Sequence, residues 1–199
     1  MSAKRQRLRN RPSGPPAHEA RGRPGGIGRP SSAAAESVSD ALRRESDTYL
    51  DRRRRIAALT LGAMGSLGAV AAYPFGLVGG LPEPPLRILN ANRVDASGEA
   101  YHYLQTPDAA LGLLSSAATL VLVGMGNRRR ASSRHWLLLA MAAKVAGDAA
   151  FGLYLTAEQV SKHRRLCSYC LVAAAASVVA VPQAVPEALA SVAARRRRA

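Results

Sequence analysis

Long uncharged runs alternate with short basic blocks along most of this chain. Residues 56–80 carry no charged side chain, and further apolar runs cover 109–126, 135–156 and 166–186. A helix of about 20 apolar residues is long enough to cross the ~30 Å hydrocarbon core of a bilayer. The second run lies near the lower limit of that length. The pattern therefore predicts an all-α, polytopic membrane protein built as a four-transmembrane-helix bundle.

The segments before and after these runs are basic. Residues 1–35 are rich in Arg, Pro, Gly and Ser, which predicts a disordered tail. Residues 36–55 are expected to form a juxtamembrane amphipathic helix, whose polar face carries Arg43, Arg44, Arg52 and Arg53. Such a helix can lie on an anionic leaflet, or it can be only a charged lead-in to the first span. The expected membrane domain covers 56–190, and a basic tail follows at 191–199.

The net charge of +15 is concentrated in blocks, and their positions predict a topology. With four spans, the blocks at 52–55, 128–134 and 195–198 lie on one side of the membrane. Basic loops favour the cytoplasm, so both termini are expected there. The segment 81–108, with four acidic residues against two arginines, then faces the outside. The basic tail lacks interleaved aromatic residues, so membrane lipid is the expected partner and nucleic acid is not.

The two cysteines of the chain form a C-x-x-C pair, Cys167 and Cys170, at the start of the last apolar run. Such a pair can be half of a zinc site, a redox disulfide or a coincidence of packing. Zinc needs about four ligands and only His163 lies nearby, so no metal is expected. A position in the first helical turn stabilises a thiolate, and the basic run 162–165 would add to this unless it only marks the membrane boundary. We therefore interpret the pair as redox-active.

Three further polar residues have a possible chemical role. Lys144 and Asp148 interrupt the third apolar run four positions apart, on one face of a helix. Charged residues inside a membrane indicate either a proton path or an ion pair facing the bundle, and both interpretations stay open here. His102, in the outer segment, has no second ligand in view, so an interfacial or hydrogen-bonded histidine is expected there.

The order and spacing of two motifs resemble those of the vitamin K epoxide reductase family, over about Ile56 to Ala190. One is Leu-Cys-Ser-Tyr-Cys-Leu at 166–171, at the head of the last span. The other is Thr-Pro-Asp-Ala-Ala-Leu-Gly at 106–112, which looks like the family's entry to its second span. The resemblance includes bacterial members that oxidise protein disulfide carriers with quinone. It implies a thiol–quinone oxidoreductase with ubiquinone or menaquinone as cofactor.

The resemblance also implies roles for individual residues. Cys170 would pass electrons to the quinone, and Cys167 would exchange with a thiol from outside. Asp108 stands where family members commonly have a quinone-binding asparagine, and Ala174 stands where many have a tyrosine. Together with Leu111, these two positions are the expected quinone contacts.

The chain departs from the family pattern in the first outer segment. Active members usually carry a second cysteine pair there, and 81–108 contains none. An exported thioredoxin-like partner could attack Cys167 directly, a partner could supply the missing pair, or activity has been lost. The expected function is a quinone-linked oxidoreductase of the bacterial inner membrane that serves oxidative folding. The alternative is a non-catalytic four-helix membrane scaffold.

Overall fold

A computed structural model describes residues 33–102, 104–126 and 135–196. The chain divides into two compact units, 1–33 and 34–199, and the first of these lies almost entirely outside the described residues. The basic block at 128–134, the last three residues and all but 33–35 of the expected disordered tail also lie outside them, so these expectations stay predictions. Residues 33–35 belong to a helix.

Every described element is helical apart from one isolated parallel bridge between Leu89 and Leu166, so the all-helical prediction is confirmed. In chain order the elements are α2 Ala33–Arg44, α3 Thr48–Ala71, α4 Ala91–Asp95, the 3₁₀ helix η1 Gly98–Tyr101, α5 Asp108–Gly124, α7 His135–Glu158, the π-helical turn η2 Gln159–His163, and α8 Ser168–Arg196.

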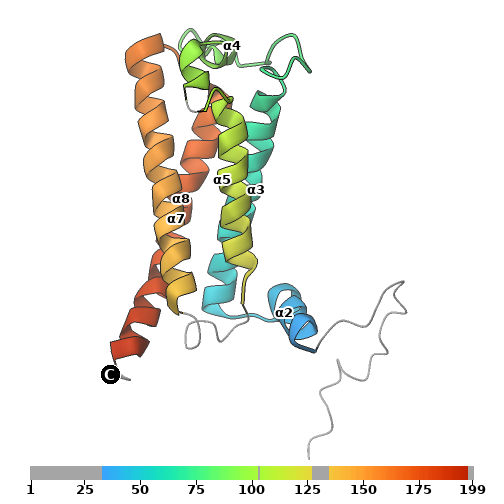
Figure 1. The fold of residues 1–199 in the computed structure, drawn as a ribbon, viewed down its shortest axis with the longest axis vertical. Helices are drawn as coiled ribbons and strands as arrows, with labels where there is room; N and C mark the ends of the chain where they lie inside the picture. The colour runs from blue at the N-terminus through green and yellow to red at the C-terminus, as the bar shows by residue number, and fades with distance from the viewer. Residues whose placement is uncertain (1–32, 103, 127–134, 197–199) are drawn as a thin grey trace, which may run out of the picture. The chain divides into compact units, whose positions relative to one another are not determined.

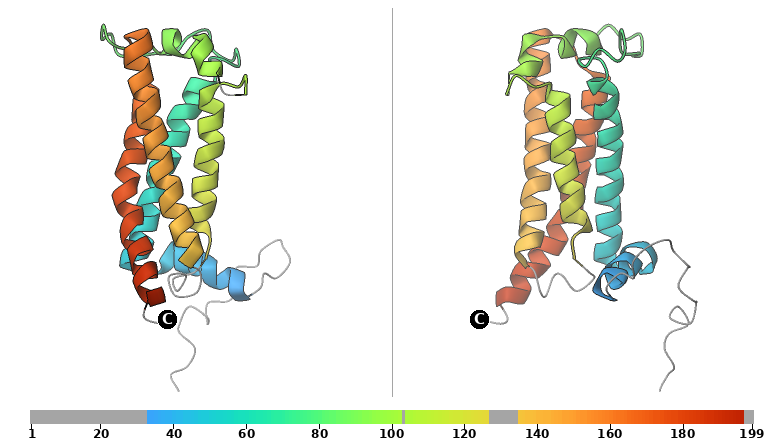
Figure 2. Two further views of the ribbon diagram at one scale, coloured as in Figure 1. Left: turned by 60° about the vertical axis from the view of Figure 1, so that its left-hand side comes forward. Right: turned by 45° about the vertical axis from the view of Figure 1, so that its right-hand side comes forward.

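The helices α3, α5, α7 and α8 lie side by side as a bundle (Figure 1 and Figure 2). Residues 72–107, which connect α3 to α5, include α4 and η1 and cover one end of this bundle; we call them the cap. One apolar cluster joins the cap to the bundle and includes Val70, Leu81, Ala91, Val94, Ala109 and Cys167. A second lies between the far ends of the helices and includes Ile56, Val123, Met141, Val145 and Ala184.

The helix bounds differ from the expected ones at several places. The expected helix 36–55 is not one helix, because α2 ends at Arg44 and α3 already begins at Thr48. The first expected span, 56–80, is helical only as far as Ala71, which lies three residues before Pro74. The last span does not end at its prolines. Instead, α8 continues through Pro182 and Pro186 to Arg196.

Within the part of the chain that the structure describes, two helical stretches are long and apolar enough to cross a membrane, His135–His163 and Ser168–Arg196. The helix α5 is apolar but has 17 residues, and α3 carries Arg52 to Arg55 within its first two turns. Large apolar side chains are exposed along the bundle, including Leu114, Val121, Leu139, Phe151 and Val179. An apolar surface of this extent is typical of a protein surrounded by lipid.

Close approach between helices occurs at Gly112 and Gly152. The sequence places Gly62, Gly65 and Gly68 on the first span, but a Cβ atom at any of them would meet nothing within 4 Å. In contrast, a Cβ at Gly112 would lie 3.0 Å from Leu67, and one at Gly152 would lie 3.3 Å from the backbone of Ala174. The tight contacts are therefore those of α5 with α3 and of α7 with α8.

Arg53 is buried in the bundle and does not face lipid as the amphipathic pattern predicts. Its side chain is 2% exposed, and its guanidinium donates to the carbonyl oxygens of Val123 at 2.6 and 3.0 Å, Met125 at 3.3 Å and Gly126 at 3.2 Å. These carbonyls lie at the C-terminal end of α5, where helical carbonyls lack partners and a positive charge is favourable. Arg53 therefore holds the start of α3 against the end of α5.

We expect Arg53→Leu to lower the free energy of unfolding by more than about 2 kcal/mol, because one buried and two partly buried carbonyls lose a charged donor. Arg55→Leu is the matched control, since Arg55 lies on the same helix and is exposed. Thermal unfolding of both purified variants in one detergent measures the difference. Equal melting temperatures for the two variants would contradict this role of Arg53.

Candidate functional site

The segment that carries the C-x-x-C pair is tied to the cap by hydrogen bonds. Ile88 O accepts from the Leu166 amide at 2.8 Å, and Leu166 O accepts from the Asn90 amide at 2.9 Å. The Glu83 carboxylate accepts from both the amide and the hydroxyl of Ser168, each at 2.8 Å, and from the Ala91 amide. Because Ser168 and Ala91 are the first residues of α8 and α4, one carboxylate satisfies two helix N-termini.

The two cysteines lie in different surroundings. Cys167, just before α8, is 0% exposed and belongs to the apolar cluster below the cap. Its amide donates to Oε1 of Gln159 at 3.0 Å, and its Sγ accepts from the Cys170 amide at 3.3 Å. Both thiols are free. Hydrogen bonding from Cys170 lowers the pKa of the Cys167 thiol, against the opposing effects of burial, Glu83 and Asp95.

Residues of the basic run 162–165 have other contacts in the structure. Lys162 forms an ion pair with Glu158 at the surface, and Arg164 turns the chain with a left-handed φ of 50°. The carboxylates of Glu83 and Asp95 raise the pKa of the Cys167 thiol. Hydrogen bonds within the C-x-x-C turn oppose this effect and stabilise the thiolate.

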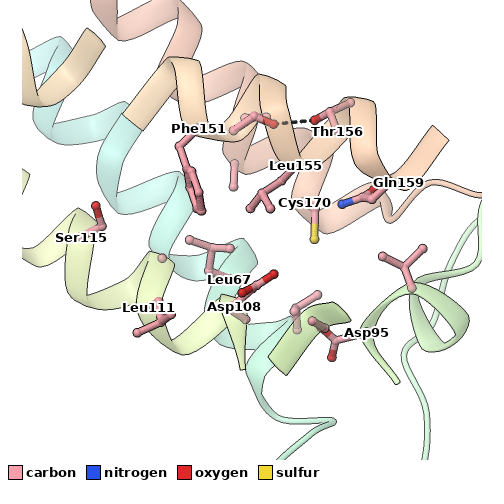
Figure 3. A pocket seen from close by; sticks show the side chains of 18 of the residues that line it. Leu67, Asp95, Asp108, Leu111, Ser115, Phe151, Leu155, Thr156, Gln159 and Cys170 are labelled. Carbon is pink, nitrogen blue, oxygen red and sulfur yellow. Dashed lines mark hydrogen bonds between the residues drawn. The ribbon is translucent and has the colours of Figure 1, made fainter. Parts of the chain in front are cut away.

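A cavity of about 420 Å³ lies between the bundle helices beneath the cap (Figure 3). Cys170 lies on its wall, together with Asp108, Leu111 and Ala174, the three positions that the sequence singles out for a quinone. Much of the remaining wall is apolar and includes Ala63, Leu67, Val70, Phe151 and Leu155. The structure thus brings four of the predicted site residues together, whereas Cys167 lies outside the cavity wall.

Two buried polar residues on this wall are not found from the sequence. Gln159, 8% exposed, accepts from the Cys167 amide, and no motif marks it. Asp95, 6% exposed, ends α4, and in the sequence it is only one of four acidic residues in the outer segment. Asp95 Oδ2 and Asp108 Oδ1 are buried and accept no hydrogen bond. Burial, and then the nearby Asp108, raises the pKa of Asp95 from 3.8 to about 6.

Lys144 and Asp148 form an ion pair, which extends to two hydroxyls of α5. Lys144 Nζ lies 2.5 Å from Asp148 Oδ1 and donates to Ser115 Oγ at 2.7 Å. The hydroxyls of Ser115 and Thr119 donate to the Asp148 carboxylate at 2.7 and 2.8 Å. Asp148 and Ser115 also line the cavity, while Lys144 does not. The cluster therefore joins α5 to α7 at the edge of the cavity.

Metal ligands do not gather at this site. Within the ranges that the structure describes, no group of three or more His, Cys, Asp or Glu side chains is placed to hold a metal ion. His102 lies exposed on the cap, and His163 on the cavity wall.

Removing one member of the Lys144–Asp148 pair should harm stability more than removing both. Lys144→Met leaves a partly buried carboxylate without its cation, whereas Lys144→Met with Asp148→Leu leaves no charge. We expect the free energy of unfolding of the single variant to fall by more than about 2 kcal/mol below that of the wild type. The double variant should regain most of this difference. Lys162→Met, in the surface pair with Glu158, is the control and should change stability by less than about 1 kcal/mol. A double variant less stable than the single one would contradict this.

Asp95 should destabilise the fold at neutral pH. Because its pKa is raised from 3.8 to about 6, the folded state favours the neutral acid, and stability falls as pH rises from about 4 to about 6. The cost of the ionised form is then at most about 3 kcal/mol. We expect Asp95→Asn to melt at a higher temperature than the wild type at pH 7.5 and at the same temperature near pH 4. Asp40→Asn is the control, since Asp40 is half-exposed in surface ion pairs with Arg43 and Arg44. A wild type as stable as Asp95→Asn at pH 7.5 would refute the expectation.

Comparison with known proteins extends these observations. A model of the vitamin K epoxide reductase family matches residues 55–185, a region that contains the cap, the cavity wall and the C-x-x-C pair. No curated protein and no solved structure matches the chain. Members of the family are four-helix membrane proteins that act as quinone-linked thiol–disulfide oxidoreductases. Because the match covers well over half of the chain, this integral membrane protein belongs to the vitamin K epoxide reductase family.

Proposed function

We propose that this protein passes electrons from thiols outside the cytoplasm, through Cys167 and Cys170, to a membrane quinone, in support of oxidative protein folding. The observation that carries the proposal is the place of Cys170 on the wall of the apolar cavity, three residues from a buried Cys167. Disulfide exchange needs one sulfur that meets the partner and a second sulfur close behind it. The C-x-x-C turn supplies both.

The cavity has properties that suit a quinone head group. Its volume lies within the ordinary range for small-molecule sites, and most of its wall is apolar. The buried Oδ1 of Asp108, which lacks a partner, suits a carbonyl ligand, because a protonated carboxyl donates a hydrogen bond. A quinone would accept two electrons and two protons there. We infer that Asp108, Leu111 and Ala174 contact it, and both ubiquinone and menaquinone belong to this class.

The two cysteines then have separate roles. A partner thiolate attacks Cys167, the disulfide between Cys167 and Cys170 opens, and Cys170 leaves as a thiolate. A second partner thiol releases the partner as a disulfide, so the C-x-x-C pair has gained two electrons and two protons. The pair becomes a disulfide again when it passes the two electrons and two protons to an acceptor in the cavity.

The partner that fits this chain is an exported thioredoxin-like protein that reacts with Cys167 directly. Within 81–108 there is no cysteine to carry electrons from a partner to Cys167. Cys167 is 0% exposed beneath the cap, so the cap has to open for a partner sulfur to reach it. The hydrogen bonds of Glu83 and of the Leu89–Leu166 bridge are the contacts that such opening breaks.

We further propose a bacterial inner-membrane location with the cap outside and both termini in the cytoplasm. The arginines at the start of α3 and the end of α8 support this, because both lie at the end of the bundle away from the cap (Figure 1). Positively charged segments favour the cytoplasmic side. The membrane domain would then cover 56–190.

Cys170→Ser should trap a mixed disulfide between Cys167 and an exported thioredoxin-like protein, because no second sulfur remains to release it. Cys167→Ser is the matched control and should trap nothing. Both variants are expected to fold, since serine is close to cysteine in size and both thiols are free in the structure. Non-reducing gels of membranes, followed by mass spectrometry, identify the adduct.

An assay of quinone reduction with the same three proteins tests whether electrons reach a quinone. Purified wild type, with a reduced thioredoxin-like protein and a soluble ubiquinone or menaquinone analogue, should reduce the quinone, and neither cysteine variant should. If the wild type reduces neither quinone and Cys170→Ser traps no partner, the scaffold alternative replaces the oxidoreductase.

A further inference from the structure

We propose that Asp95 is the proton carrier of Cys170: its carboxylate takes the thiol proton when Cys170 forms a disulfide and returns it when that disulfide opens. The inference rests on the proposed function, because it gives a cap residue a part in the chemistry of the same cysteine pair. It assigns the role from the burial and position of Asp95, and no motif in the sequence marks this residue.

The Asp95 side chain is buried at the cavity wall without the partners that a buried acid normally has. It is 6% exposed, Oδ2 has no hydrogen-bond partner, and the side chain lines the cavity that Cys170 also lines (Figure 3). A buried carboxylate is normally paired or hydrogen-bonded, as Asp148 is with Lys144, Ser115 and Thr119. Asp95 lacks such partners at Oδ2, so this oxygen is available to accept a proton from the cavity.

The helix α4, which carries Asp95, is held in place by several hydrogen bonds. Asn90 caps α4 by accepting from the Arg93 amide at 2.8 Å, and Asn92 accepts from the Leu81 amide at 2.8 Å. Glu83 and the Leu89–Leu166 bridge tie the same segment to the residues beside Cys167. A proton carrier has to be held close to the group that it serves, and these contacts fix α4 relative to the C-x-x-C turn.

The negative charge of Asp95 acts electrostatically on the cysteine pair. Asp95 acts on both thiols, and its negative charge opposes formation of a second negative charge on either sulfur. Moving the thiol proton onto Asp95 as the sulfur reacts removes this repulsion, so the carboxylate and the thiolate need not be charged together. The other titratable groups of the cavity wall are Asp108 of α5, Asp148 and Glu158 of α7, and His163 of η2, and Asp148 is paired with Lys144.

The chemical step balances with a disulfide as the oxidant. A small disulfide R–S–S–R first reacts with Cys167 and gives Cys167–S–S–R and one R–S⁻. Cys170 then attacks the Cys167 sulfur, so the bond to R breaks, the bond between Cys167 and Cys170 forms, and a second R–S⁻ leaves. The proton of the Cys170 thiol goes to Asp95 Oδ2. This second step needs no quinone and isolates the part played by Asp95.

The test is rapid mixing of the reduced, full-length protein in detergent with 4,4′-dithiodipyridine, followed by acid quench and mass spectrometry at a series of pH values. In the wild type, the second step should slow as pH falls through about 6, because protonated Asp95 cannot accept a proton. Asp95→Asn should slow the second step at least about tenfold at pH 7 and abolish this dependence. The first step should not slow, because loss of the Asp95 charge favours the Cys167 thiolate.

Two further variants separate proton transfer from a structural effect. Asp95→Glu should recover most of the rate, and added formate should accelerate Asp95→Asn but not the wild type. Thr106→Ala is the matched control, since Thr106 lies in the cap but outside the cavity wall, and its hydroxyl contacts only the Leu104 carbonyl among the described residues of the cap. It should behave as the wild type does.

The outcomes distinguish this inference from the proposed function. If Asp95→Asn completes the second step as fast as the wild type and with the same pH dependence, the role of Asp95 is refuted, whatever the protein does with quinone. Equal slowing by Thr106→Ala, or no rescue by Asp95→Glu and by formate, would also refute it. A wild type that oxidises its cysteines as described but reduces no quinone would refute the proposed electron acceptor and leave Asp95 as the proton carrier.

Discussion

The contact on which the site depends is the one between the Glu83 carboxylate and the first residues of α4 and α8. A helix N-terminus presents amides without partners and a partial positive charge, so one carboxylate can hold two such ends together. Glu83 and Ser168 are 85 positions apart in the chain, and their contact fixes the cap over the C-x-x-C turn. The same contact places the negative charge of Glu83 at the N-terminus of α8. This charge opposes the stabilisation that the helix dipole would otherwise give to a thiolate there.

The chemistry of the cysteine pair follows from that arrangement. With Glu83 and Asp95 both raising the pKa of Cys167, the hydrogen bonds from Cys170 have to supply the stabilisation of the thiolate. Under the proposed function, opening the cap both admits a partner sulfur and removes Glu83 from the turn. Access and thiolate stability would therefore change together, which links the reactivity of Cys167 to the arrival of a partner.

The charged groups in and around the cavity differ in whether they have partners. Lys144 and Asp148 neutralise each other and are surrounded by hydroxyls, as expected for charges that join two helices in a low-dielectric setting. Asp95 has no cation and leaves one oxygen unsatisfied at the cavity wall. The fold therefore retains a destabilising carboxylate at Asp95, although it pairs the charges of Lys144 and Asp148. This difference is consistent with a functional role for Asp95.

The sequence by itself determined the apolar runs, the helical class, the C-x-x-C pair and the family, because each of these depends on local composition or on short, ordered motifs. It also brought Asp108, Leu111, Ala174 and Cys170 forward as one site. Only the tertiary structure decided that Cys167 is covered, that Arg53 closes the end of α5, and that Glu83, Asp95 and Gln159 surround the cysteine turn. The physical reason is that these contacts join segments far apart in the chain, and a carboxylate in a loop has the same local pattern whether it faces water or a cavity.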